Sequence, residues 1–185
     1  NGENSILVYP GANQRLDTPY IDRKWEKIVA HDIFLLQLEI PIESVIYTIT
    51  RLREAGKTII LDPAPAQVLP DSMISVVDYL TPNLLELEAL TGLAVDDEEG
   101  IKRAAEQLLD RGARYVITKA GPVGAYITDS ESTRNRAAFQ RPGAKGIPGG
   151  GVTVCCRHNV ISMRMSARSY TQSTGTGTGL KPYVS

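Results

Sequence analysis

Short continuous runs of apolar residues alternate along the chain with segments in which apolar residues recur every three or four positions. A continuous run without polar alternation predicts a strand that is buried on both faces. Such runs lie at residues 32–38, 58–62, 75–80 and 114–118, and residues 124–128 pair with the last of these or follow it. Another apolar run, at residues 5–9, stops at a Pro-Gly turn.

The periodic segments predict amphipathic helices around residues 18–29, 45–52, 83–92 and 98–111. Thr18 followed by Pro19 is typical of an N-cap and first helical position, and Gly56 and Gly92 are suited to follow a helix end. Strands that alternate with helices in this way predict an α/β fold with a doubly wound, mostly parallel sheet. Ligands collect at the carboxyl ends of the strands in such sheets.

Polar residues follow several of the predicted strands. Gln37 and Glu39 lie at the end of the first, Asp62 ends the second, and Asn83 and Glu86 follow the third. The sequence KAGPVG, beginning at Lys119, follows the fourth. Carboxylate and amide oxygens are suitable ligands for Mg²⁺, directly or through water. Glycine lets backbone N–H groups approach an anion closely. These residues therefore predict a metal-assisted phosphate site along one edge of the sheet.

Each of these residues also has a purely structural interpretation. Asn83 with Glu86 has the spacing of a helix cap with an acidic residue at the third position. Glu39 fits a solvated acid past a strand end, Asp62 before Pro63 a turn former, and KAGPVG a hairpin turn. Capping and ligand binding are compatible for Asn83 and Glu86.

Composition divides the chain unequally. The formal net charge of −1 over 185 residues combines −9 over residues 1–133 with +8 over residues 134–185, which contain no acidic residue. The second segment also holds 8 of the 16 glycines and both cysteines. We expect residues 1–133 to be the α/β core and residues 134–185 to be a basic, Gly/Ser-rich tail that is disordered or translated out of frame. No apolar stretch has the length of a membrane span, and the two adjacent cysteines favour a reducing, cytoplasmic location over a disulfide framework.

An ordered set of motifs resembles one family. The sequences PGAN, LLQLEIP, LDPAPA, LTPNLLELEALTG and VITKAGPVGA, in this order and spacing, resemble the middle of ribokinases, which belong to the PfkB group of carbohydrate kinases. The resemblance covers residues 2–128.

The resemblance implies an ATP-dependent sugar kinase that uses Mg²⁺. It places Glu39 at the sugar, and Asn83 and Glu86 at the Mg²⁺ and triphosphate, with Glu86 contacting the metal directly or through water. Lys119, Gly121 and Gly124 match the turn beside the nucleotide. Ribokinases usually have Thr where this chain has Lys119, so a one-residue shift to Thr118 is the alternative.

Two parts of the family pattern have no match in this chain. The sugar-binding and lid-forming part would precede Asn1, and the Asp-Thr-x-Gly-Ala-Gly-Asp motif, which supplies the catalytic base, is absent after Thr128. We therefore expect an incomplete ribokinase-like core that is inactive alone and has no catalytic base of its own. The sugar stays open, and the resemblance implies a homodimer for the intact relatives.

A different class of function is the main alternative. The chain could be a non-catalytic binding protein on a kinase-derived core, with the basic tail contacting an anionic partner. Nucleic-acid arms are usually dense in Lys and Arg with interspersed aromatic residues. The tail spreads 8 basic residues over 52 positions, which argues against nucleic acid.

Overall fold

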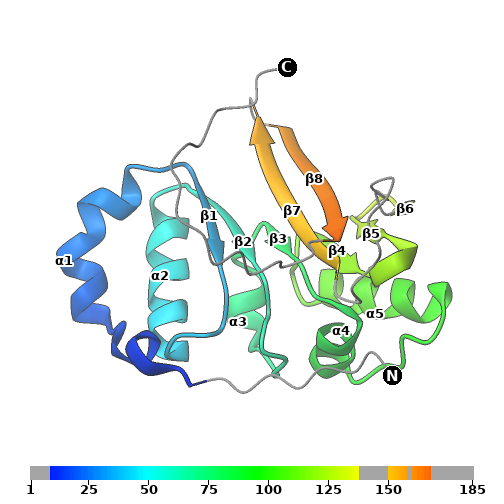
Figure 1. Ribbon diagram of the computed structural model, residues 1–185, viewed down its shortest axis with the longest axis horizontal. Coiled ribbons are helices and arrows are strands. Elements are labelled where there is room, and N and C mark those ends of the chain that lie inside the picture. The colour runs from blue at the N-terminus through cyan, green and yellow to red at the C-terminus, as the bar shows by residue number, and fades with distance from the viewer. Residues whose placement is uncertain (1–8, 138–149, 158–159, 168–185) are drawn as a thin grey trace, which may run out of the picture.

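The computed structural model of the protein describes residues 9–137, 150–157 and 160–167. A six-stranded sheet in the order β1-β2-β3-β4-β5-β6 dominates this part of the chain (Figure 1). Its strands are β1 (Ile33–Leu36), β2 (Thr58–Leu61), β3 (Tyr79–Leu80), β4 (Tyr115–Lys119), β5 (Ala125–Thr128) and β6 (Thr133–Arg136). The first four pair in parallel and the last two are antiparallel additions, which confirms the predicted α/β class with a mostly parallel sheet.

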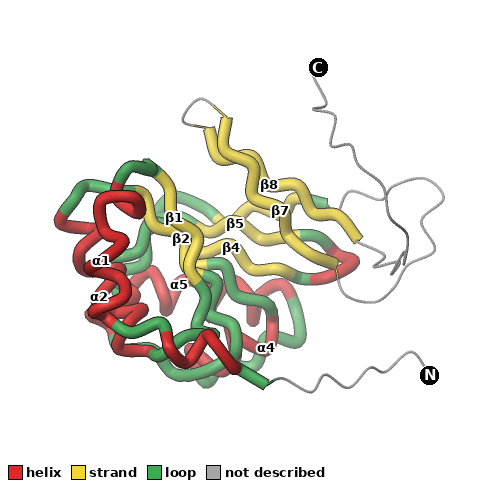
Figure 2. Tube along the Cα trace, turned by 60° about the vertical axis from the view of Figure 1, so that its left-hand side comes forward, coloured by secondary structure: helices red, strands yellow, loops and turns green. Residues whose placement is uncertain are grey.

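Helices precede the first strand and connect the parallel strands. They are α1 (Thr18–Val29), α2 (Ile42–Glu54), α3 (Asp71–Ile74), α4 (Leu84–Thr91) and α5 (Glu98–Asp110), with short 3₁₀ turns η1 (Gly11–Arg15) and η2 (Gly121–Val123). Helix α1 packs on α2, α2 contacts β2, and α5 contacts β4 and β5. In Figure 2 the helices lie to one side of the strands.

Two local predictions differ from the structure. The N-cap of α1 is Asp17, whose carboxylate accepts a hydrogen bond from the Tyr20 backbone N–H at 2.8 Å, so Thr18 is already inside the helix. The apolar run at 75–80 forms a strand only at Tyr79–Leu80, because the backbone N–H of Ser75 bonds to the Asp71 carbonyl and continues the turn of α3.

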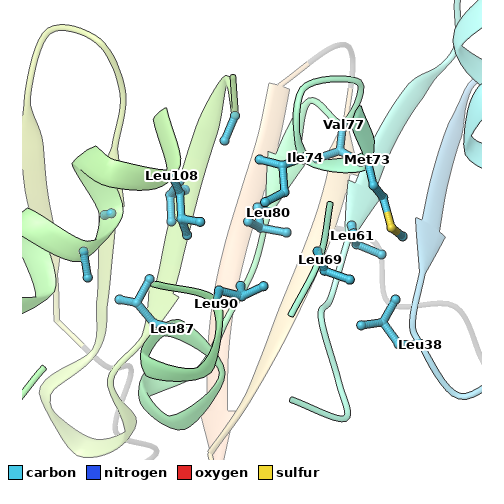
Figure 3. Packing of buried hydrophobic residues seen from close by; sticks show 14 of the residues in the cluster. Leu38, Leu61, Leu69, Met73, Ile74, Val77, Leu80, Leu87, Leu90 and Leu108 are labelled. Carbon is cyan, nitrogen blue, oxygen red and sulfur yellow. The ribbon is translucent and has the colours of Figure 1, made fainter. Parts of the chain in front are cut away.

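One hydrophobic core joins the helices to one face of the sheet. Figure 3 shows side chains from the loop before α3, from α3 itself, from β2 and β3, and from α4 and α5 meeting there. Leu61, Leu80 and Leu108 are each 0% exposed. Burial of a side chain of this size contributes about 1.5–3 kcal/mol, so the core fixes the strands whose ends carry the polar residues.

A second, separate sheet consists of β7 (Gly150–Arg157) and β8 (Val160–Ala167), which pair antiparallel. Figure 1 shows this hairpin extending away from α4 and α5. The large sheet itself continues through β6 to Arg136, past the predicted core boundary at residue 133. The interpretation of residues 134–185 as a disordered or out-of-frame tail stays a prediction. The apolar run at 5–9 falls outside the described residues except for Tyr9.

Candidate functional site

The turn between β3 and α4 carries a reciprocal capping box. The Asn83 side-chain oxygen accepts a hydrogen bond from the Glu86 backbone N–H at 2.8 Å. In return the Glu86 carboxylate accepts from the Asn83 backbone N–H at 2.7 Å and from the Asn83 side-chain amide at 2.8 Å. Glu86 is 5% exposed and lies at a helix N-terminus, where the helix dipole favours negative charge. The helix cap that the spacing of Asn83 and Glu86 predicts is thus present in the structure.

Lys119, the last residue of β4, brings a positive charge to the same place. Its ammonium lies 2.6 Å from Asp62 Oδ1 and 3.7 Å from Glu86 Oε2. The Lys119 side chain is 16% exposed and that of Asp62 is 22% exposed. The two carboxylates come from different strand ends, so Lys119 joins them into one cluster.

The backbone sets these side chains at one edge of the sheet. Asp62 directly follows β2, and its N–H bonds to the Leu36 carbonyl at 2.9 Å. The Lys119 N–H bonds to the Pro82 carbonyl at 2.8 Å, and Asn83 forms a parallel bridge with Lys119. Parallel pairing therefore aligns the ends of β2, β3 and β4.

The structure distinguishes the two residues that the motif alignment left open. The Thr118 side chain is 0% exposed, and its hydroxyl is the one buried side-chain group of the described residues that has no hydrogen-bond partner. Successive side chains of a strand point to opposite faces, so Lys119 faces away from Thr118 and toward Asp62. Of the two residues, Lys119 is the one at the cluster.

The turn after Lys119 requires glycine at two positions. Gly121 has φ +55°, and Gly124 combines φ 114° with ψ −136°, which is a conformation that other residues rarely adopt. The turn closes through a bond from the Ala120 N–H to the Gly124 carbonyl at 2.8 Å. As the structural interpretation expects, this turn joins the antiparallel pair β4 and β5.

Glu39 lies apart from the charged cluster. It lines an open cavity of about 230 Å³ together with Asn13, Gln37 and apolar residues of β1 and the following loop. The hydrogen bonds and ion pairs of the described residues do not link Glu39 to Asp62, Glu86 or Lys119. The two regions are neighbours through the backbone, since the Leu38 N–H bonds to the Ala64 carbonyl at 2.8 Å.

The donor set fits a hydrated divalent ion better than a fully dehydrated one. Among the described residues, no group of three or more His, Cys, Asp or Glu side chains could hold a metal ion. Both Glu86 oxygens already accept hydrogen bonds, but a carboxylate has about four acceptor positions, so contact through water remains open. Mg²⁺ commonly keeps several waters and uses one or two carboxylates together with substrate phosphates.

In the part of the chain that the structure describes, no helix is long and apolar enough to cross a membrane.

Sequence reasoning missed two features of this edge. Asn13 of η1 reaches the cavity of Glu39, and only its place in the PGAN motif pointed to it. The sequence places Asp62 at the predicted site and also allows a turn former, but it does not reveal that the Asp62 carboxylate pairs with a lysine 57 positions away along the chain. No local pattern reveals a pair so distant in sequence.

Comparison with known proteins gives consistent relatives. The chain is 34% identical over 134 residues to the ribokinase of Haemophilus influenzae, and the match covers 72% of this chain and 44% of that protein. It is 39% identical over 141 residues to the deoxyribokinase of Salmonella typhi, covering 76% of this chain and 46% of the relative. The chain thus spans about half the length of these curated relatives.

Solved structures agree with the sequence matches. The ribokinase of Thermotoga maritima has a TM-score of 0.65 at 34% identity, and the match covers 77% of this chain and 46% of that one. The ribokinase of Arabidopsis thaliana, solved with ribose and ATP, has a TM-score of 0.68 at 26% identity, covering 78% and 47%. Residues 1–143, which are most of the chain, match the family model described as pfkB family carbohydrate kinase. The chain therefore belongs to the pfkB family of carbohydrate kinases.

Proposed function

We propose that this chain carries part of an ATP-dependent sugar kinase of the ribokinase type. Such an enzyme transfers the γ-phosphoryl group of ATP to a hydroxyl group of a pentose such as D-ribose. The observation that supports this most directly is the cluster of Asn83, Glu86 and Lys119 at the carboxyl edge of the sheet. The relative from Arabidopsis thaliana, which was solved with ribose and ATP, supports the choice of ligands.

In this proposal the chain's own residues bind and orient the nucleotide. Lys119 donates to a phosphate oxygen, and the turn at Gly121 and Gly124 presents backbone N–H groups. Asn83 and Glu86 would hold a hydrated Mg²⁺, and the ion would neutralise phosphate charge. Phosphoryl transfer depends mainly on such positioning and charge stabilisation. Glu39 binds the sugar in the neighbouring cavity.

We further propose that the 185-residue chain alone does not catalyse the reaction. No Asp follows Asp129, and residues 129–185 contain no Asp-Thr-x-Gly-Ala-Gly-Asp sequence. Loss of one preorganised donor already costs about 10²–10³ in rate, so loss of a base together with its anion-binding glycines costs more. The chain should bind the nucleotide without turning it over.

Two measurements on the purified chain test this proposal. Calorimetry should detect ATP binding in the presence of Mg²⁺, and Asn83→Ala or Glu86→Ala should weaken it about tenfold or more, the scale of one lost charge-assisted contact. Glu88→Ala is the matched control, because Glu88 lies on the same helix but bonds to the Val95 N–H instead. A coupled ADP-release assay should show no sugar-dependent turnover.

Two results would contradict the proposal. Unchanged ATP affinity in the Glu86→Ala protein would show that the capping box is not part of the ATP-binding site. Ribose-dependent ADP release that Glu86→Ala abolishes would show that the chain contains a base outside the family motif.

The origin of residues 134–185 has its own test. We propose that most of this segment is not native to the family, either because the reading frame has shifted or because a foreign segment is fused there. The family model matches through residue 143, so the change lies near or after that residue. Reading the coding DNA in all three frames past the codon for Thr133 should reveal the missing motif if the frame has shifted. Its absence from every frame would favour a fusion or a genuine divergent tail.

A further inference from the structure

The charged cluster at the carboxyl edge is not electrically balanced. One ammonium, that of Lys119, serves two carboxylates, Asp62 at 2.6 Å and Glu86 at 3.7 Å. The three side chains are mostly buried, with exposed fractions of 16%, 22% and 7%. The cluster therefore has a net charge of −1, and charges in such a setting are screened less than at an open surface.

This imbalance affects any anion that approaches Lys119. A polyphosphate carries several negative charges, and it would have to compete with Asp62 for the same ammonium. Like charges a few ångströms apart repel by several kcal/mol at the effective dielectric constant of a protein surface. A bound divalent cation offsets this repulsion, because it lowers the charge of the polyphosphate and is attracted by the carboxylates.

The contacts of Asp62 show that it does more than form a turn. A turn-forming Asp bonds to a backbone N–H two or three residues further along the chain. The side chain of Asp62 instead contacts Lys119 from β4, two strands away in the sheet order. The same loop is already fixed by backbone bonds from Leu38 to Ala64 and from Asp62 to Leu36.

We propose that Asp62 is a positioning residue that determines which form of polyphosphate this edge accepts. Asp62 holds the Lys119 ammonium and excludes metal-free polyphosphate, so only a polyphosphate that carries a divalent cation displaces the Asp62–Lys119 pair. The inference rests on the proposed nucleotide site. It adds that Asp62 determines whether this site accepts metal-free polyphosphate or only polyphosphate that carries a divalent cation. Asp62 acts through Lys119 and does not itself touch the ligand.

Isothermal titration of the full chain with inorganic tripolyphosphate in EDTA tests this directly. Asp62→Asn keeps the shape of the side chain and removes its charge, so it should bind metal-free tripolyphosphate about tenfold or more tighter than the unmodified chain. Lys119→Met in the Asp62→Asn background should abolish this gain. Asp32→Asn is the matched control, because Asp32 also pairs with a lysine, Lys57 at 3.3 Å, but lies at the amino end of β1. This change removes an equal charge far from the cluster and should leave the affinity for tripolyphosphate unchanged.

The outcomes separate the inference from the proposed function. An Asp62→Asn protein that is folded by circular dichroism, yet binds metal-free tripolyphosphate no tighter than the unmodified chain, would overturn the inference even if Mg-ATP binds normally. Failure of the unmodified chain to bind Mg-ATP would count against the proposed function, whereas the metal-free arm tests the exclusion by Asp62 separately. If Asp62→Asn does not fold, Asp62→Ser is measured in the same way with the same two outcomes.

Discussion

Replacing Asn83 separates the capping role that the structure shows from the ligand contact that we propose, because the two depend on different atoms. Asn83→Ala removes the oxygen that accepts from the Glu86 N–H and the amide that donates to Glu86 Oε1. Asn83→Ser retains a capping oxygen but loses the amide. The two variants therefore share the loss of the amide and differ in the cap.

The magnitude follows from the geometry of the box. Loss of an N-cap oxygen typically costs about 0.5–2 kcal/mol. Here the first turn of α4 also contains Glu86, 5% exposed, which loses one of its partners. A neutral donor to a charged acceptor contributes about 1.5–3 kcal/mol, though the backbone N–H of Asn83 still bonds to Glu86. We expect Asn83→Ala to lower the free energy of unfolding by about 2–3 kcal/mol, and Asn83→Ser by about 1 kcal/mol less.

Urea unfolding followed by circular dichroism measures both values, with equal slopes required for a valid comparison. Leu85→Ala is a suitable control on the same turn, because Leu85 is 73% exposed and should change stability by no more than about 0.5 kcal/mol. Equal destabilisation by Asn83→Ala and Asn83→Ser would refute the reasoning, since the cap would then contribute nothing.

Three further changes probe the rest of the fold. Leu108→Ala should cost about 2–5 kcal/mol in urea unfolding, because Leu108 is 0% exposed and its removal leaves a cavity. Arg111→Met should cost about 2–3 kcal/mol by the same assay, since Arg111 donates at 2.7 Å to Asp71 and to two backbone carbonyls. Hydrogen bonds from the backbone N–H groups of Glu131 and Ser132 lower the pKa of Asp129 below its ordinary value. Stability from Asp129 is thus present above the unfolded pKa and lost as pH falls through the folded pKa, so Asp129→Asn should make the acid limb of the stability–pH curve shallower.

Much of the fold could be predicted because local chemistry and tertiary packing agree. The apolar run at 58–62 forms β2 close to its predicted bounds, and its side chains are buried on both faces as the lack of polar alternation indicates. The helix after Asn83 begins and ends where its cap and Gly92 indicate. In both cases the signal lies within a few residues of the feature that it predicts.

Other elements depend on contacts that a local pattern does not contain. Residues 75–77 are apolar enough for a strand, but they follow directly after the short helix α3, whose last turn Ser75 continues, and only Tyr79–Leu80 pairs in the sheet. Asp17 and Thr18 both have side chains suited to an N-cap, and in the structure Asp17 is the N-cap because its carboxylate reaches the Tyr20 N–H. Competition between neighbouring residues of similar propensity is decided by packing, which a sequence window does not include.

The candidate site shows the same division at the level of side chains. The ends of parallel strands could be placed at one edge from the sequence, because parallel pairing requires it. The sequence could not show which charged side chains pair, because Asp62 and Lys119 are 57 residues apart along the chain and Glu39 lies in a separate cavity. Sequence reasoning thus predicted a row of polar groups, whereas the structure divides that row into a charged cluster and a cavity. Under the proposed function this division assigns a different ligand to each part, so a charge change in one part is not expected to alter binding in the other.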